Sequence, residues 1–360
     1  MKKILVTGGC GFLGSHVCEY FKEKGWDVVS YDNLTKFEYK RTEYNVEKIR
    51  DYNLKFLEGI GVLTIVDDIR DLEQLVKVAN GCNLIAHCAA QPAMTIALED
   101  PLLDEDINIR GILNVLEAAR QVGAAVVNCS TIHLYGNGLN YELMEKETKF
   151  VRPKGPIGEK EEILTGSLTP LHASKMATEL YTRTYAESYG VKAASFRLTG
   201  IYGPRQFGGE DHGWVANFAI RTLMDLPIKV FGTDKQVRDI LYVKDAARAF
   251  YCWYKGGCKS GIYNIGGGGR TEISIRECLN TLSELTGKKQ DIKIEPARKG
   301  DLWWFISDYS KASDTFDWRP LVRPQEGLEQ LVNYIKENKE LFKCSIIEGR
   351  ANAASNIMCR

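Results

Sequence analysis

Three glycines near the start of the chain, Gly8, Gly11 and Gly14, have the spacing of a turn that binds a diphosphate. The apolar residues 4–6 before them predict a buried strand, and residues 11–22 predict a helix. In such a turn the first glycine permits the bend, the second lets a pyrophosphate approach the backbone, and the third lets helix and strand pack closely. Because the helix start also supplies free N–H groups and a positive dipole end, the spacing predicts a dinucleotide-binding turn.

A carboxylate follows this turn at the distance where a ribose-binding acid is expected. Residues 27–32 predict a second strand, and Asp32 closes it about 20 residues past the glycines. Asp32 would accept hydrogen bonds from both hydroxyls of an adenosine ribose and would repel a 2′-phosphate, which favours NAD over NADP. The alternative is an ordinary surface aspartate at a strand end. The strand, the glycine turn, the helix and the acid together favour the cofactor interpretation.

Composition narrows the class of protein. The 360 residues include 47 basic and 47 acidic side chains, so no strong field favours nucleic acid or a membrane as partner. No apolar run approaches the roughly 20 residues that span a bilayer, and the chain enters a strand at once, without the regions of a signal peptide. The ten cysteines lack CxxC spacing and the five histidines lack metal-ligand spacing, which favours reduced thiols and no bound metal. We expect a soluble cytoplasmic enzyme.

Strand and helix alternate through the first part of the chain, which is the pattern of a doubly wound α/β fold. Polar residues 33–57 predict a helix with flanking loop outside the core, and residues 137–169 predict a loop or lid. Further strands are predicted at residues 61–66, 83–90, 124–131 and 192–199, and helices at 104–120 and 170–189.

We expect a doubly wound parallel (Rossmann) sheet with a smaller C-terminal α/β substrate lobe. The NAD-binding domain would cover residues 1–205, with later segments around 230–265 returning to it, and the lobe would lie mainly in residues 206–342. Residues 343–360 form a tail whose sequence Ile347-Glu-Gly-Arg350 resembles an engineered protease site, with a native tail as the equal alternative.

Three further features extend the pattern: Tyr135-Gly136 past the fifth strand, Lys175 in the long helix, and Asp245. With them the chain resembles the extended short-chain dehydrogenases/reductases that act on nucleotide sugars, over roughly residues 1–335. Within that superfamily it is most similar to the CDP-tyvelose (CDP-paratose) 2-epimerases. The resemblance implies that bound NAD⁺ oxidises a sugar hydroxyl, that the keto-sugar presents its other face, and that the hydride returns, at C2 of the hexose in the 2-epimerases. The closer similarity lies in residues 91–95, 205–207, 213–215 and 235–239.

The resemblance also implies roles for individual residues. Thr131 matches the residue that hydrogen-bonds the reacting oxygen, and Lys175 matches the lysine that holds the nicotinamide ribose and lowers the pKa of the partner base. Arg238 and Arg298 match positions that grip the diphosphate and ribose of the substrate. The implied cofactor site comprises Gly8, Gly11, Phe12, Leu13, Gly14, Asp32, Asn33, Asp68, Ile69, Ala89, Ala90, Gln91, Asn108 and Lys175. The implied substrate site comprises Thr131, Arg205, Gln206, Trp214, Arg238 and Arg298.

Each of these residues also has a purely structural interpretation. A threonine can satisfy a strand end, a helix lysine can be solvated, and a tryptophan can pack in the core. Arg238 lies in an apolar setting, where a charge needs a partner, and it can pair with Asp239 or Asp245. Arg298 can lie in a surface turn.

One position departs from the family pattern. In the family, a tyrosine four residues before the lysine lies on the same helix face, and its phenolate removes the hydroxyl proton during hydride transfer. Here that position holds Leu171, which cannot carry a proton. His172, three residues before Lys175, and His133, two residues after Thr131, are the two histidines placed to replace it, and packing is the alternative for each. The phenols of Tyr135 and Tyr202 match positions that are structural in the family.

We therefore expect an NAD-dependent nucleotide-sugar epimerase with a CDP-hexose as favoured substrate and Thr131, Lys175, His133 and His172 as catalytic candidates. Two other interpretations stay open. One is another reaction of the family, as a 4-epimerase, dehydratase or decarboxylase, although the Asp-Glu pair of the dehydratases is replaced by Ile132-His133. The other is a catalytically silent protein that binds NAD and a nucleotide sugar. By resemblance, the two helices at 104–120 and 170–190 would form a homodimer interface.

Overall fold

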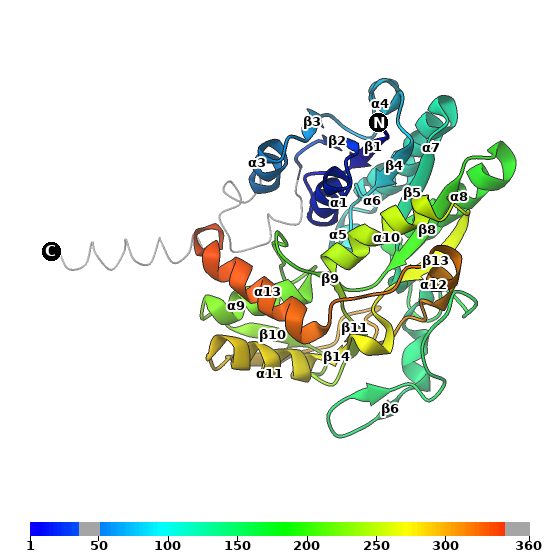
Figure 1. The fold of residues 1–360 in the computed structure, drawn as a ribbon. Helices are drawn as coiled ribbons and strands as arrows, with labels where there is room; N and C mark the ends of the chain where they lie inside the picture. Colours follow the sequence, from blue (N-terminus) through cyan, green and yellow to red (C-terminus); the bar gives the residue numbers. More distant parts are fainter. Residues whose placement is uncertain (36–50, 343–360) are drawn as a thin grey trace, which may run out of the picture.

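The computed structural model describes residues 1–35 and 51–342 and contains a central parallel sheet (Figure 1). The sheet has seven strands in the order β13-β8-β5-β4-β1-β2-β3. Every neighbouring pair in it is parallel. The predicted doubly wound α/β fold is thereby confirmed. The strands are β1 (Lys3–Thr7), β2 (Asp27–Asp32), β3 (Leu63–Val66), β4 (Leu84–His87), β5 (Ala125–Thr131), β8 (Ala193–Leu198) and β13 (Gly261–Ile265).

The other elements cover this sheet or build smaller sheets beside it. The helices are α1 (Phe12–Glu23), α3 (Tyr52–Gly59), α4 (Leu72–Ala79), α5 (Met94–Glu99), α6 (Pro101–Glu105), the π-helix η2 (Asp106–Arg110), α7 (Gly111–Val122), α8 (Pro170–Tyr189), α9 (Trp214–Leu223), α10 (Val243–Lys255), α11 (Ile275–Thr286), α12 (Ser310–Phe316) and α13 (Pro324–Glu337). The 3₁₀ turns are η3 (Ile132–Tyr135), η4 (Asn137–Glu142), η5 (Gly268–Arg270) and η6 (Lys339–Leu341). The remaining strands are β6 (Met144–Glu145), β7 (Phe150–Val151), β9 (Ile201–Tyr202), β10 (Ile228–Phe231), β11 (Val237–Asp239), β12 (Leu241–Tyr242), β14 (Glu272–Ser274), β15 (Ile292–Glu295) and β16 (Trp304–Phe305).

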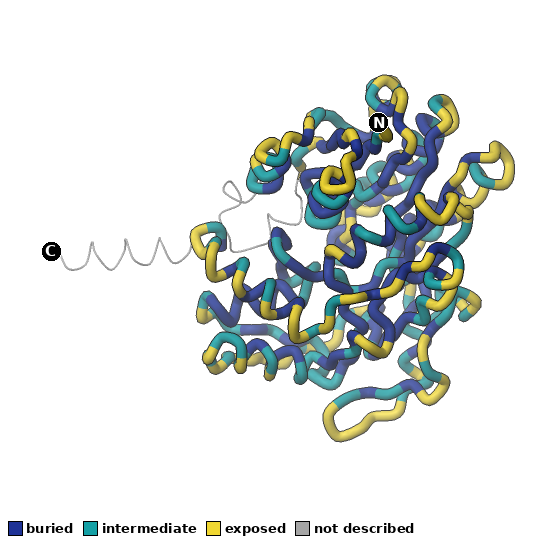
Figure 2. Tube along the Cα trace, in the orientation of Figure 1, coloured by how far each residue is buried: buried dark blue, intermediate teal, exposed yellow. Residues whose placement is uncertain are grey.

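Two helical layers bury the two faces of the central sheet. Successive side chains of a strand point to opposite faces, so Ile4 and Val6 pack with α1 and α10 on one side. Leu5 packs with α4 and α7 on the other side. Figure 2 shows the buried residues concentrated along these strands. Coverage on both faces explains why the strands are almost continuously apolar.

A separate core lies between α9, α11, α13 and β10, below the large sheet in Figure 1. It includes Val215 and Ile220 of α9, Leu279 of α11 and Leu331 of α13. Between β10 and α11 the chain returns to the large sheet. There α10 packs beside α1, and β13 pairs with β8. The domain division at residue 205 stays a prediction. No helix in the described residues has the length and apolar character needed to cross a membrane.

Both ends of α8 agree with the helix predicted at residues 170–189, and the residues that cap the helix explain this agreement. Thr169 is the N-cap of α8, Pro170 stands at its first position, and Gly190 ends the helix in the left-handed conformation with φ of 70°. Proline is tolerated in the first turn of a helix, because an N–H at that position would have no partner within the helix. Glycine adopts positive φ at little cost. These three residues define the element that carries Lys175.

The helix predicted at 104–120 is not one regular helix. The structure has α6, the π-helix η2 and α7 in succession. A π-turn widens the helix locally and changes the direction of its side chains, and periodicity alone does not reveal it. The π-turn contains Asn108, whose side-chain Oδ1 accepts a hydrogen bond from the backbone N–H of Gln91 at 3.0 Å.

Two polar segments were predicted as loops or peripheral helices. In the first, α3 forms the end of the segment, whereas residues 36–50 lie outside the described residues, as does the tail at 343–360. The second contains η4 and the short hairpin of β6 and β7. It is anchored by Arg152, whose buried guanidinium pairs with Glu142 at 2.7 Å and Glu161 at 3.2 Å.

A buried ion pair connects α8 to two strands of the central sheet. Glu179 Oε2 accepts from Arg197 Nη2 of β8 at 2.8 Å, and both side chains are almost fully buried. Glu179 Oε1 also accepts from Arg197 Nε at 2.9 Å and from Ser130 Oγ of β5 at 2.6 Å. The guanidinium lies over the ring of Tyr135, 4.8 Å from its centroid. One carboxylate therefore fixes the helix against the end of β5.

We predict that Glu179→Ala lowers the free energy of unfolding by about 3–5 kcal/mol, because it leaves a buried guanidinium without its counter-charge. Chemical denaturation followed by circular dichroism would measure this. The matched control is Glu187→Ala in the same helix, which removes an exposed partner of Arg183 and should change stability only slightly. Equal effects of the two substitutions would contradict the prediction.

Candidate active site

The glycine turn joins β1 to α1 as predicted. Gly8 has φ of 68°, and a β-carbon there would lie 2.6 Å from the backbone nitrogen of Ala89. A β-carbon at Gly14 would overlap the carbonyl oxygen of Gly8, so close packing of helix and strand requires glycine at this position. The N-cap of α1 is Gly11, and in the described part of the chain it makes no side-chain cap hydrogen bond. The first N–H groups of the helix, at Phe12 and Leu13, therefore lie where a diphosphate would accept from them.

Asp32 lies beside this turn at the end of β2. Its Oδ2 accepts from the N–H of Cys10 at 2.9 Å and its Oδ1 accepts from the N–H of Leu34 at 2.8 Å. These bonds orient the carboxylate, and each oxygen keeps a second lone pair for a ribose hydroxyl. The predicted juxtaposition of turn and acid is present.

Asn33, Asp68 and Ile69, which the family resemblance places in the cofactor site, lie next to β2 and β3. Asn33 donates to Asp68 Oδ2 at 2.9 Å, and Arg70 pairs with the same carboxylate at 2.8 Å. The Arg70 guanidinium holds the pKa of Asp68 at about 2. Ile69 is buried, and its side chain occupies the space beside Gly111 of α7.

The end of β4 and the π-turn form a buried amide network. Gln91 and Asn108 exchange hydrogen bonds, since Asn108 Nδ2 donates to Gln91 O at 3.1 Å. Asp104 Oδ1 accepts from both side-chain amides, at 2.9 and 3.0 Å. Burial raises the pKa of Asp104, a residue that sequence reasoning left without a role. The network fixes the segment Ala89-Ala90 against the glycine turn.

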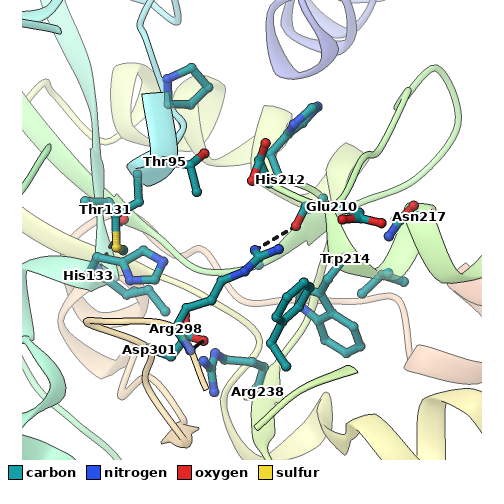
Figure 3. A pocket seen from close by; sticks show the side chains of 18 of the residues that line it. Thr95, Thr131, His133, Glu210, His212, Trp214, Asn217, Arg238, Arg298 and Asp301 are labelled. Carbon is teal, nitrogen blue, oxygen red and sulfur yellow. Dashed lines mark hydrogen bonds between the residues drawn. The ribbon is translucent and has the colours of Figure 1, made fainter. Parts of the chain in front are cut away.

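A cavity of about 600 Å³ opens between the large sheet and the smaller core (Figure 3). Thr95, Thr131 and His133 lie on one side of it, Trp214 lies opposite, and Arg298 reaches between them. Of the predicted substrate residues, Thr131, Gln206, Trp214, Arg238 and Arg298 line the cavity.

Arg205 is the exception among the predicted substrate residues. It is not in the cavity lining. Its Nη2 instead pairs with Glu19 at 2.7 Å, its Nε contacts Ser15 Oγ at 3.2 Å, and its guanidinium lies over Phe56. The arginine therefore holds the connection between the two cores against α1.

The two other arginines are inside the cavity wall. Arg238 donates to the carbonyls of Val237 and Leu302. Its hydrogen bonds therefore do not include Asp239 or Asp245, the two partners that a purely structural role would have given it. Burial lowers the pKa of Arg238 to about 10, while the charges of Asp301 and Asp239 act in the opposite direction. Arg298 donates to the carbonyl of Glu210 at 2.8 Å and lies over the ring of Phe231. Neither guanidinium is neutralised by a salt bridge within the described residues, which suits a bound anion.

The groups expected to do chemistry meet at the end of β5. Thr131 Oγ1 accepts from the N–H of His133 at 3.2 Å. Lys175 is buried behind them, where its Nζ donates to Cys129 O at 3.0 Å and burial lowers its pKa. Leu171 lines the cavity where the family tyrosine would lie. The helix therefore presents an apolar side chain to the reacting position.

The two histidines have different surroundings. His133 lines the cavity, and its buried Nδ1 has no hydrogen-bond partner among the residues that the structure describes. Burial lowers the pKa of His133 to about 3, and the charges of Arg238 and His172 act in the same direction. His172 is absent from the cavity lining. Its Nδ1 accepts from the N–H of Thr169 at 3.1 Å, which closes a capping box at the start of α8.

Sequence reasoning missed Thr95 as a site residue, although it lies in a segment that carries the family resemblance. Thr95 lines the cavity, and its buried hydroxyl has no hydrogen-bond partner within residues 1–35 and 51–342. A buried hydroxyl without a partner is costly, and a sugar hydroxyl would satisfy it. The only sequence signal was its position a few residues past Gln91, at the start of α5.

Residues 4–266 match the NAD dependent epimerase/dehydratase family. The chain belongs to that family. It is 30% identical over 344 residues to a CDP-paratose 2-epimerase from Salmonella typhi, a match that covers 92% of this chain and 98% of the relative. The resemblance to this family is therefore confirmed, and NAD is its cofactor.

Solved structures of other family members share the fold. A UDP-glucose 4-epimerase from Thermotoga maritima with UDP-glucose has a TM-score of 0.79 and 31% identity, covering 94% of this chain and all of that one. A UDP-glucose 4-epimerase from Thermus thermophilus in complex with NAD has a TM-score of 0.73 and 33% identity, covering 93% and 99%. Relatives of this family thus bind nucleotide sugars and NAD.

We predict that Asp32→Ser lowers the preference for NAD over NADP by more than about tenfold, because it removes the charge that would repel a 2′-phosphate. Isothermal titration of both cofactors would measure the ratio of dissociation constants. The control is Asp27→Ser at the exposed, opposite end of β2, which should leave the ratio unchanged. Equal weakening of both cofactors by Asp32→Ser would show a structural role only.

Proposed function

We propose that this protein is an NAD-dependent epimerase of a nucleotide-activated hexose, with a CDP-hexose as substrate and C2 as the reacting carbon. The observation that carries the proposal is the continuity of one cavity from Thr131 to Arg238 and Arg298. One end offers a hydroxyl beside the buried lysine of the cofactor site. The other offers two guanidinium groups for a diphosphate. The similarity to a CDP-paratose 2-epimerase supports the nucleotide and the carbon.

The proposed chemistry assigns one task to each group. The residues of the glycine turn, Asp32 and Lys175 would hold NAD⁺, which when bound would supply the hydride acceptor for the sugar carbon. Thr131 Oγ1 hydrogen-bonds the oxygen that becomes the ketone. Lys175 holds the nicotinamide ribose from behind, and its positive charge favours the developing alkoxide. The apolar Leu171 takes no part in proton transfer, so another group must accept the hydroxyl proton.

We propose His133 as that proton acceptor. It lines the cavity two residues from Thr131, and its lowered pKa keeps the imidazole neutral throughout the physiological range. A neutral imidazole can accept a proton, although a low pKa makes it a weak base. A bound diphosphate would offset the charge of Arg238 and thereby strengthen that base. His172 is the weaker candidate, because its Nδ1 is committed to the helix cap.

Two alternative functions have specific support. The similar structures of two UDP-glucose 4-epimerases favour a UDP-hexose and C4. Leu171 in the cavity wall favours a catalytically silent protein that binds NAD and a nucleotide sugar. We also propose a homodimer through α7 and α8, because Leu180 and Tyr181 of α8 are exposed at 52% and 38%.

The deciding experiment is NMR of the protein with NAD⁺ and CDP-, UDP- and GDP-hexoses in D₂O. A C2 epimer of a CDP-hexose without deuterium on carbon would establish the proposal. Inversion at C4 would establish the first alternative. Deuterium on carbon would indicate enolisation, as in a dehydratase. Binding of a nucleotide sugar without turnover would establish the silent protein.

We predict that His133→Ala lowers kcat by about 10²–10⁴-fold, the usual contribution of general acid–base catalysis. His172→Ala should destabilise the start of α8 by about 0.5–2 kcal/mol and leave kcat within a few-fold. Since the pKa of His133 is about 3, kcat/KM of the wild type should show no acid limb between about pH 5 and 8. Near-full turnover of the His133→Ala variant would refute the proposed base.

We predict that Leu171→Tyr restores at least about tenfold in kcat to the His133→Ala variant, because a phenol at this position supplies the missing proton acceptor. Leu171→Phe in the same background is the matched control, since it adds the ring without the hydroxyl. Rescue by both aromatic residues would show an effect of packing. Turnover by Leu171→Tyr alone, with none in the wild type, would support the silent protein.

A further inference from the structure

Two thiols lie next to each other on neighbouring strands at the cofactor edge of the sheet. The last paired residues of β4 and β5 are His87 and Asn128. Cys88 and Cys129 follow them in register, and their Sγ atoms are 3.8 Å apart. Both side chains point to the face that α1 covers. Within the described residues, both thiols are free.

The backbone of each cysteine touches a group that holds NAD. The carbonyl oxygen of Cys129 accepts from Lys175 Nζ at 3.0 Å. On the other strand, the carbonyl carbon of Cys88 lies 2.9 Å from the position of a β-carbon on Gly8, so Cys88 packs directly beneath the glycine turn. The two sulfurs therefore lie between the turn that would bind the pyrophosphate and the lysine that would bind the nicotinamide ribose.

We propose that Cys88 and Cys129 are a reversible oxidation site, in which hydrogen peroxide converts the two thiols into a disulfide and thereby weakens NAD binding. The thiolate of Cys88, which is half-buried, attacks the peroxide, breaks the O–O bond and becomes a sulfenic acid, with release of water. The thiol of Cys129 then displaces the sulfenic oxygen as a second water. Two thiols and one peroxide thus give one disulfide and two waters.

The spacing of the strands permits this bond but strains it. Neighbouring strands lie about 4.8 Å apart, within the range of Cα separations found in disulfides. The sulfurs must still approach from 3.8 Å to about 2.05 Å, while the two parallel strands hold their Cβ atoms side by side. Strained disulfides are easily reduced, which is typical of regulatory bonds.

We expect the two thiols to react slowly with oxidant, and most slowly while NAD is bound. The hydrogen bond with Cys129 and burial both raise the pKa of Cys88, while the ammonium of Lys175 acts in the opposite direction. Thiolate, the reactive form, is therefore scarce. Bound NAD would also cover the edge of the sheet where Cys88 is accessible. We infer that the pair responds to sustained oxidant when the cofactor is absent.

Closing the bond moves both strand ends, and through them the glycine turn and Lys175. Coupling between two equilibria is reciprocal. If the disulfide weakens NAD binding by a given factor, NAD must disfavour the disulfide by the same factor. If the two factors are equal, the oxidation site and the NAD site are coupled. Incidental oxidation of buried thiols would give no such equality.

The experiment treats the full chain, freed of NAD, with hydrogen peroxide and maps its peptides by mass spectrometry. We expect one crosslink joining the peptides of Cys88 and Cys129, with loss of two hydrogen masses that dithiothreitol reverses. The oxidised protein should bind NAD at least about fivefold more weakly by titration calorimetry. Saturating NAD should shift the thiol–disulfide equilibrium in a glutathione buffer by the same factor.

The controls separate this pair from the other cysteines. Cys88→Ser and Cys129→Ser should each abolish the crosslink and the loss of affinity, whereas Cys258→Ser, in the same core but outside the pair, should retain both. A crosslink to another cysteine, such as Cys10, would overturn the proposal. Unchanged NAD affinity in the oxidised wild type would overturn it as well, and that measurement needs no variant to fold.

Discussion

The geometry of the active site depends on a carboxylate that takes no part in the chemistry. Glu179 follows Lys175 by one helical turn, and Ser130 precedes Thr131 by one residue. The hydrogen bond from Ser130 Oγ to Glu179 and the paired bonds from Arg197 fix these two segments relative to each other. Since all three groups are buried, water cannot replace any partner. The separation between the Thr131 hydroxyl and Lys175 is therefore set by packing and charge in the core.

The cavity also depends on how the central sheet and the smaller lobe are held together. The central sheet supplies Thr131 and His133 at the end of one strand, but the guanidinium groups come from the smaller lobe, at β11 and the turn before Asp301. Arg205 bridges these parts by pairing with Glu19 of α1. The site is thus composite. The half that would bind the cofactor consists of the sheet and the glycine turn. In the half that would bind the substrate, Trp214 packs on the separate core of α9, α11 and α13, whereas Val237, next to Arg238, packs in another cluster with Ile132 and Trp304.

The sequence predicted the elements that are governed by local physics. Strands buried on both faces are apolar throughout, and the Thr169-Pro170 start and Gly190 end of α8 are local signals. The π-turn at Asn108 was not predictable, because it depends on hydrogen bonds to Gln91, which is distant along the chain. For the same reason the sequence placed Arg205 in the substrate site. Its guanidinium is drawn to Glu19, a partner that no spacing in the chain reveals.

His172 shows a further limit of helical spacing. Its position near Lys175 indicated a shared face, but a histidine three residues past an N-cap can also turn back to accept from the cap N–H. That bond forms here. His133 had the opposite outcome, since its strand-end turn exposes the ring to the cavity. Sequence spacing therefore identified both histidines as candidates. Only the hydrogen bond of His172 to the helix cap distinguishes it from His133, which faces the cavity.

Leu171 changes what the buried lysine can do. In the family pattern the lysine lowers the pKa of a phenol on its own helix face. Here Lys175 has no such phenol before it, so in the proposed mechanism its charge would act on the ribose and on the alkoxide beside Thr131. The proposed mechanism places proton transfer in the turn after β5 and not on the helix, because His133 lies there, near Arg238. The basicity of that imidazole then depends on whether an anion covers the arginine, so substrate binding itself would prepare the base.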